Sequence, residues 1–221
     1  MIDPRRKILC CDMDGTLTWL NTFVVWFGLL IVFHPLRSFR IFIQQLNKNT
    51  QIRIPKRIAL AVEEQLQPTA INQLQRKMSL ISLVVFRTNT RSFVREMRDS
   101  GFSVVVISNS SRVSLQPLAS SIKADLIATH NQEDGGIVQV NSIQKAFFLK
   151  DWIMKNNYLN PYIIGIGDSS GDLEMLKMCD RAFMVRGTFQ RRSKTIHKTA
   201  IQMIRFNQIV QLIRKEYAGT S

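Results

Sequence analysis

The chain has 221 residues, 45% of them hydrophobic, and its 30 Lys and Arg against 16 Asp and Glu give a net charge of +14. This length fits one main domain with a smaller inserted piece, and the apolar fraction excludes a wholly disordered chain. The positive charge favours a polyanionic ligand: a phosphorylated molecule, an anionic membrane or, less strongly, nucleic acid. No obligate protein partner is inferred.

Cysteine usage and apolar runs bear on location. Cys10, Cys11 and Cys179 form neither a zinc pattern nor a disulfide framework, and adjacent Cys10 and Cys11 would face opposite sides of a strand. A reduced, cytoplasmic compartment is therefore expected. No signal peptide is expected, because the first apolar run is short and contains two aspartates. The longest run, Phe23–Phe33, is too short for a full transmembrane span.

Short apolar runs that alternate with helical patterns predict an α/β fold, a doubly wound Rossmann-like parallel sheet with helices on both faces. The expected strands are Lys7–Cys11, Ser103–Ile107, Leu126–Ala128, Tyr162–Ile166 and Ala182–Val185, and the expected helices are Asn89–Asp99, Val113–Ile122 and Ser142–Lys155. Gly135-Gly136 before Ile137-Val138 indicates a small hairpin or a turn before a strand.

Residues 17–89 break this alternation, because they show helical patterns and prolines without a clear strand. We predict a helical cap at 17–89, inserted after the first strand, and a catalytic core formed by residues 1–16 and 90–221. Basic residues in the cap are opposed only by Glu63 and Glu64, so the cap carries about half of the net charge.

The strongest chemical signal is Asp12-Met13-Asp14-Gly15-Thr16, directly after the first strand. Alternate positions place both carboxylates on one side, and Gly15 permits a sharp turn beneath them. Two other strands also end in polar clusters, at Ser108 and at Asp168. The carboxyl ends of parallel strands line one crevice, so these clusters are expected to meet in one pocket.

From Asp12 to about Val185, the sequence resembles the haloacid-dehalogenase-like phosphatases, in the branch related to phosphoserine phosphatase. DMDGTLT resembles their first motif, VVVISNS their second, Lys145 their third and GDSSGDLEML their fourth. The resemblance implies an enzyme that hydrolyses phosphomonoesters. Asp12 would attack phosphorus and become phosphorylated, while Asp14 would act in turn as acid and base.

The resemblance also implies a Mg²⁺ site at the same carboxylates. Asp12, the backbone carbonyl of Asp14 and Asp168 would be ligands, and Asp172 would hold a ligand water in the second shell. The plain structural alternative is that Asp168 and Asp172 cap the helix that follows them.

Three residues would bind the phosphoryl group by resemblance. Lys145 would neutralise Asp12 and the phosphate, and Ser108 and the amide of Asn109 would donate hydrogen bonds to phosphoryl oxygens. Lys150, on a neighbouring turn, is the alternative to Lys145, and Ser108 could be an ordinary hydroxyl at the end of a strand.

The residues that would read an amino-acid substrate are changed. Asn21 stands where phosphoserine-specific relatives have glutamate, Asn109 where they have glycine, and Gly171 where they have asparagine. Phosphoserine is therefore a poor candidate. A lipid or other apolar phosphate leads, and a soluble metabolite phosphatase or a phosphotransferase is the alternative. Outside the enzymes, the alternative is a basic binding protein on an inactive scaffold.

The apolar segment Phe23–Phe33 has two interpretations. It is either a buried cap helix or an interfacial helix whose Trp26 enters a membrane surface beside Arg37 and Arg40. The second interpretation favours a lipid substrate and a peripheral association with membranes. The basic stretch Arg186–Lys215 likewise predicts either a surface for membrane or nucleic acid, or a solvated helix face.

Overall fold

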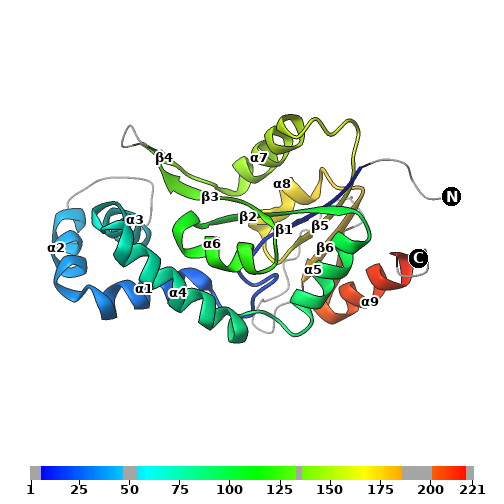
Figure 1. The fold of residues 1–221 in the computed structure, drawn as a ribbon. Helices are drawn as coiled ribbons and strands as arrows, with labels where there is room; N and C mark the ends of the chain where they lie inside the picture. The colour runs from blue at the N-terminus through cyan, green and yellow to red at the C-terminus, as the bar shows by residue number, and fades with distance from the viewer. Residues whose placement is uncertain (1–5, 47–53, 133–135, 186–200, 218–221) are drawn as a thin grey trace.

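The computed structural model describes residues 6–46, 54–132, 136–185 and 201–217. Its sheet has the strand order β4-β3-β2-β1-β5-β6-β7, and neighbouring strands are parallel except β3 and β4 (Figure 1). The strands are β1 (Lys7–Cys11), β2 (Phe102–Ser111), β3 (Asp125–Asn131), β4 (Ile137–Val138), β5 (Tyr162–Gly167), β6 (Arg181–Val185) and β7 (Gln202–Ile204). The predicted Rossmann-like fold is confirmed, and all five predicted strands are present.

Helices cover both faces of the sheet (Figure 1). They are α5 (Thr90–Asp99), α6 (Arg112–Ser121) and α9 (Phe206–Tyr217) on one face, and α7 (Ser142–Lys155) and α8 (Leu173–Leu176) on the other. Leu9 and Cys11 of β1 pack with the first set, and Ile8 and Cys10 with the second. Burial on both faces explains why this strand reads as a continuous apolar run, and the two cysteines face opposite sides as predicted.

A helical segment leaves the sheet after β1 and returns before α5, and it lies beside the sheet in Figure 1. Its helices are α1 (Thr22–Phe33), α2 (Pro35–Leu46), α3 (Ile54–Gln65) and α4 (Pro68–Val85). The two connections pair with each other, since the Trp19 N–H donates to the Val85 carbonyl at 3.1 Å and the Arg87 N–H to that of Leu17 at 2.9 Å. These connections lie close to the predicted limits of the cap, whose division from the core stays a prediction.

Helix α1 is buried along one side, and Trp26 lies on that buried side. Trp26 is wholly buried, and its indole N–H donates to Glu63 Oε1 at 2.6 Å. The interpretation in which Trp26 enters a membrane is therefore wrong, because a buried carboxylate of α3 holds the ring inside the cap. Glu63 Oε2 also accepts from the Ser111 hydroxyl at 2.7 Å, so this carboxylate joins cap and core.

Other apolar side chains of α1 and α2 face outward. We call Val32, Phe33, Leu36, Phe39, Phe42 and Ile43 the cap apolar surface; Leu36 is 86% exposed and Phe39 65%. Arg37 and Arg40 are exposed on α2, where the Arg37 guanidinium donates to the Gln65 carbonyl at 3.1 Å. Within the described residues, no single helix is long and apolar enough to cross a membrane; α1 and α2 satisfy such a test only as a pair bent by 114°.

The basic C-terminal stretch is described only in part, because residues 186–200 lie outside the described residues. Helix α9 buries Phe206, Ile209, Val210 and Ile213. Its Arg214 pairs with Glu96 of α5 at 2.6 Å. This segment is thus an amphipathic helix packed on the sheet, with its charges on the outer side.

Candidate active site

The polar clusters at the ends of three strands meet in one cavity, as expected from the sequence. Asp12 and Asp14 follow β1, Ser108 lies near the end of β2, and Asp168 follows β5. They line a cavity of about 600 Å³ between the sheet and the cap. Parallel strands bring residues far apart in the chain to one edge of the sheet.

A buried lysine joins two carboxylates at the floor of this cavity. The Lys145 ammonium on α7 donates to Asp12 Oδ1 and to Asp172 Oδ1, each at 2.6 Å. Burial lowers the pKa of Lys145, but the two carboxylates outweigh burial and hold it above its ordinary value. Lys150, the alternative on the same helix, is exposed. The structure thus brings Lys145, and not Lys150, to the carboxylates.

Asp172 supports the site from behind. Its Oδ2 accepts from the backbone N–H groups of Asp168 and Ser169, at 3.1 and 3.0 Å, and from the Ser169 hydroxyl at 3.0 Å. With Oδ1 bound to Lys145, both oxygens are occupied and the side chain is fully buried. Asp172 stands at the N-cap position of α8 without a side-chain capping bond there, but with Ser169 it forms a capping box at the short 3-10 turn Ser170–Asp172 that leads into α8. The structural alternative therefore holds in part, beside the contact with Lys145.

Asp14 points away from Lys145, toward the cap. Its Oδ1 accepts from the Thr22 N–H at the start of α1, at 2.5 Å, and its Oδ2 from the Ser110 hydroxyl at 2.7 Å. The register of β2 against β3 shifts between Ser108 and Ser111, and this bulge lies where Ser110 reaches Asp14. The sequence analysis missed Ser110; its signal was the Ser-Asn-Ser-Ser run, of which only the first two residues were chosen.

Gly15 is required by both conformation and space. Its φ is +82°, and a Cβ at this position would lie 2.2 Å from Asp168 Oδ2. Its carbonyl accepts from the Arg87 guanidinium at 2.7 Å. The turn after β1 therefore packs closely against Asp168, and the hydrogen bond from Arg87 stabilises it. The sequence analysis counted Arg87 only among the basic residues of the cap.

The carboxylates fit a divalent cation. One oxygen each of Asp12, Asp168 and Asp172 lies within 4.8 Å of the others, although both oxygens of Asp172 already accept hydrogen bonds. Burial, followed by the charge of Asp172, raises the pKa of Asp168 to about 6. Burial also raises the pKa of Asp12 well above its usual range, against the pull of Lys145. Carboxylate oxygens are donors that Mg²⁺ prefers, and a cation would offset the repulsion among these carboxylates, so the residues suit the predicted ion.

The opposite wall of the cavity carries a second lysine. Lys56 of α3 donates to the Asn109 carbonyl and, at 3.3 Å, to the Thr129 hydroxyl. Burial lowers the pKa of Lys56 to about 8. Ser108 is buried, and its hydroxyl accepts from the Ser110 N–H at 3.2 Å. Lys56 gave no sign in the sequence beyond its charge, because the contact joins residues 53 positions apart.

Of the four cap residues proposed for substrate, only Asn21 lines the cavity. Its side chain also caps α1, accepting from the Val24 N–H at 3.3 Å. Trp26 is buried in the cap, and Arg37 and Arg40 do not line the cavity. Phe23, from the first turn of α1, contributes an apolar side chain to the lining.

In an open α/β sheet, ligands bind at the carboxyl ends of the strands, and here that edge holds a carboxylate and lysine centre. The haloacid dehalogenase-like hydrolase family matches residues 9–177, and the chain belongs to this family. The predicted family and the prediction of an enzyme are therefore confirmed. No curated protein matches the chain.

Solved structures share the fold at low sequence identity. A protein of unknown function from Bordetella pertussis Tohama I has a TM-score of 0.74 at 15% identity, covering 91% of this chain and 99% of its own. A substrate-bound phosphoserine phosphatase gives 0.62 at 14% identity, with 97% and 99% covered. Phosphoserine phosphatase from T. onnurineus gives 0.54 at 19% identity, with 96% and 98% covered. These likenesses concern the fold.

Proposed function

We propose that this chain is a Mg²⁺-dependent phosphomonoester hydrolase that forms a phosphoaspartate on Asp12. The observation that carries the proposal is the buried Asp12–Lys145–Asp172 array, with Asp168 beside it, at the floor of a cavity. A buried carboxylate held by a lysine and crowded by other carboxylates suits a nucleophile that must meet an anionic phosphate. The family to which the chain belongs supports the hydrolase class.

In the first step, Asp12 forms a bond to phosphorus while the bond to the leaving oxygen breaks. Lys145 holds Oδ1, and Oδ2 has no hydrogen-bond partner within the described part of the chain, so Oδ2 is the attacking atom. Asp14 gives its proton to the leaving oxygen. In the second step, Asp14 takes a proton from the water whose oxygen attacks phosphorus, and the bond from phosphorus to Asp12 Oδ2 breaks. Inorganic phosphate leaves, Asp12 is again a carboxylate, and Asp14 is again the protonated acid. The contacts from Thr22 and Ser110 orient Asp14 for both transfers.

The cation would be held by Asp12, Asp168 and the backbone carbonyl of Asp14. When bound, Mg²⁺ supplies charge neutralisation between the attacking carboxylate and the phosphate oxygens. Asp172 belongs to the second shell, because its two oxygens already accept four hydrogen bonds from Lys145, Asp168 and Ser169. It fixes the loop that carries Asp168.

The phosphoryl group would be bound by Lys145, the Ser108 hydroxyl and the Asn109 amide. Lys56 would add a positive charge from the cap side, and its contact with the Asn109 carbonyl supports this role. Because Lys56 comes from α3, the cap supplies part of the phosphate site. Charge-assisted hydrogen bonds of this kind are stronger than neutral ones.

For the substrate we propose a lipid phosphate. The support is the cap apolar surface, together with the exposed Arg37 and Arg40 of the same helix α2, which has no acidic residue. Apolar side chains beside basic ones bind the boundary of an anionic bilayer. A cap that rests on such a surface would bring membrane phosphates to the enzyme. Phe23 gives the cavity an apolar contact on the same helix.

A soluble phosphate ester is the second candidate, because most of the residues that line the cavity are polar. Among its described lining residues only Phe23 and Pro55 are apolar apart from one glycine. A pocket of this composition reads a headgroup or a small metabolite equally well. The two candidates share the chemistry on Asp12 and differ in the role of the cap apolar surface.

The chemistry is tested with an aryl phosphate and purified protein. Hydrolysis should require Mg²⁺ and stop with EDTA, and Asp12→Asn should abolish turnover because it removes the nucleophile at nearly constant volume. Asp99→Asn, at an exposed aspartate of α5, is the matched control and should keep full activity. Turnover by Asp12→Asn at the wild-type rate would refute the proposed mechanism.

A further inference from the structure

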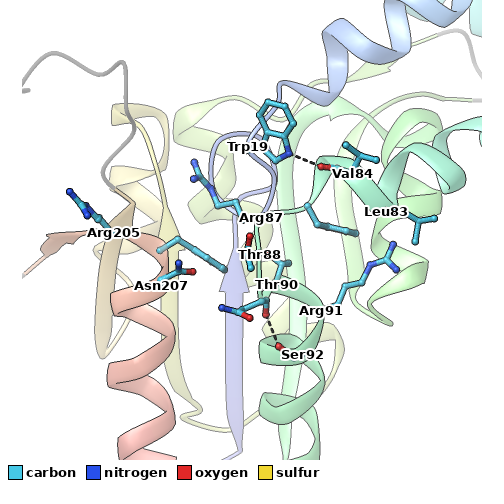
Figure 2. A pocket seen from close by; sticks show the side chains of 13 residues that line it. Trp19, Leu83, Val84, Arg87, Thr88, Thr90, Arg91, Ser92, Arg205 and Asn207 are labelled. Carbon is cyan, nitrogen blue, oxygen red and sulfur yellow. Dashed lines mark hydrogen bonds between the residues drawn. The ribbon is translucent and has the colours of Figure 1, made fainter.

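A second cavity lies where the connections between cap and core meet (Figure 2). It measures about 1040 Å³, which exceeds the active-site cavity. Its walls are Trp19, the end of α4, residues 86–92 and the start of α9, and we call it the hinge cavity. No step of the proposed hydrolysis uses it.

The hinge cavity is positively charged. Arg87, Arg91 and Arg205 line it, and none of its described lining residues is acidic. On the next turn of α5, Glu96 is engaged by Arg214 at 2.6 and 2.8 Å and does not pair with the arginines of the cavity. The cavity also includes the first turn of α5, whose partial positive charge adds to the arginines.

The arginines have neutral partners. Arg87 donates to the Gly15 carbonyl at 2.7 Å, and its buried Nε has no partner in the described residues. Arg91 donates to the Ser82 hydroxyl at 2.7 Å and lies over the Phe86 ring. Among residues 6–46, 54–132, 136–185 and 201–217, no carboxylate pairs with Arg87, Arg91 or Arg205. Arginine forks without a carboxylate match the geometry of phosphate oxygens.

Burial makes this charge costly at Arg87. It lowers the pKa of the Arg87 guanidinium, against an opposing effect of Asp168. A bound anion would offset that cost where the cavity wall now supplies only a carbonyl. In Figure 2, Arg87 and Arg205 project in the same direction, whereas Arg91 points to the other side.

Size and aromatic lining indicate the class of ligand. A cavity of this volume exceeds what one phosphate ion fills. Trp19 is 53% exposed, and its indole N–H is fixed on the Val84 carbonyl at 2.6 Å, so its ring offers a face to a planar group. The hydroxyl-bearing Thr88 and Thr90 also line the cavity.

We propose that the hinge cavity is a second anion site, which binds a small polyphosphate through Arg87 and Arg205. The polyphosphate is either inorganic or carries a planar ring that stacks on Trp19. Since Arg87 also holds the Gly15 carbonyl, an occupied site would brace the turn that carries Asp12 and Asp14. The proposal stands apart from the hydrolysis, because it requires binding and no turnover.

The proposal is tested by calorimetric titration of the full chain in buffer that contains EDTA. The ligands are inorganic tripolyphosphate and, separately, adenosine triphosphate. One molecule should bind per chain. Arg205→Gln should weaken binding about tenfold, the loss of one charge-assisted contact. Arg95→Gln, an exposed arginine of α5 outside the cavity, is the matched control and should leave affinity unchanged. Arg87→Gln, with its thermal midpoint recorded, should also weaken binding.

Two further variants separate the sites and the ligands. Trp19→Leu should weaken adenosine triphosphate and spare tripolyphosphate if the ring stacks, and should spare both if the ligand is the bare polyphosphate. Binding that is lost in Lys56→Gln and kept in Arg205→Gln would place the anion in the active site and overturn the proposal. Equal weakening by Arg95→Gln and Arg205→Gln would also overturn it, because it would show only general attraction to a basic chain.

Discussion

The active centre and the cap apolar surface differ in burial and in polarity. At the centre, Asp12, Lys145 and Asp172 are buried and each bonds another charged group. On the cap, Leu36 and Phe39 are exposed and have nothing to cover them within the described residues. Substitutions at the centre should therefore change both hydrolysis and stability. Substitutions on the cap apolar surface should change only the binding of membranes or lipid substrate.

The largest effect is expected at Lys145. Lys145→Met would leave two buried carboxylates without their cation, which typically costs about 3–5 kcal/mol. Chemical denaturation without metal should show this loss, together with loss of hydrolysis. Lys150→Met, at an exposed position of the same helix, should change stability little. Equal stability of the two variants would contradict the buried array.

Glu63 should make stability depend on pH. Burial raises its pKa from 4.5 to about 7, although Ser111 and Trp26 donate hydrogen bonds to it. The folded state keeps the proton that the unfolded state loses, so the contribution of Glu63 is full below about pH 4.5 and is lost as pH rises to about 7. At about 1.4 kcal/mol per pKa unit, the loss is on the order of 3 kcal/mol.

Glu63→Gln isolates this contribution, because glutamine can accept from Trp26 and donate to Ser111. The difference in unfolding free energy between wild type and variant should change between pH 4.5 and 7 and then level off. Denaturation curves across this range measure it. A difference that is constant over the range would show that Glu63 does not link cap and core through a protonated carboxyl.

Gly15 should be intolerant of a side chain. Gly15→Ala combines a φ of +82° with a Cβ at 2.2 Å from Asp168 Oδ2, so the turn or Asp168 must move. A loss of about 1–3 kcal/mol and of most activity is expected. Gly28→Ala in α1, where a Cβ meets nothing within 4 Å, should be neutral or stabilising by up to about 1 kcal/mol. Thermal melts and the aryl phosphate assay measure both effects. Equal effects of Gly15→Ala and Gly28→Ala on stability and activity would contradict this account.

The smallest effect on stability belongs to the cap apolar surface. Leu36→Gln with Phe39→Gln should change unfolding free energy by no more than about 0.5 kcal/mol, because both side chains are exposed. If the lipid proposal is right, this variant should sediment less with anionic vesicles and hydrolyse lipid phosphate more slowly, while soluble substrate is unaffected. Leu159→Gln, 88% exposed on the core, is the control. If the wild-type protein does not sediment with anionic vesicles, the proposal of a soluble phosphate ester as substrate would be favoured.

The fold was largely predictable because strands that are buried on both faces of the sheet have continuous apolar sequences. The prediction missed β7, whose three residues are only partly buried or exposed. Helix α1 shows the limit of periodicity. Apolar all round, it gave no sign that Trp26 would face inward and Val32 outward, because the choice depends on Glu63 of another helix.

The site was predictable where it lies in motifs and hidden where it depends on tertiary contacts. Asp12, Ser108 and Asp168 follow strands, so parallel topology alone brings them together. Ser110 reaches Asp14 across 96 positions through a bulge in β2, and Lys56 reaches the site only because the cap folds over it. Neither contact has a periodic signature in the sequence.

The central claim is that phosphate passes through Asp12. Asp14→Asn should still allow attack on an aryl phosphate, whose leaving group needs no proton, but should slow hydrolysis of the intermediate. After incubation with Mg²⁺ and acid quenching, peptide mass spectrometry should find one phosphoryl group on Asp12. A phosphoryl group on another residue, or none in a variant that turns over as fast as wild type, would contradict the account.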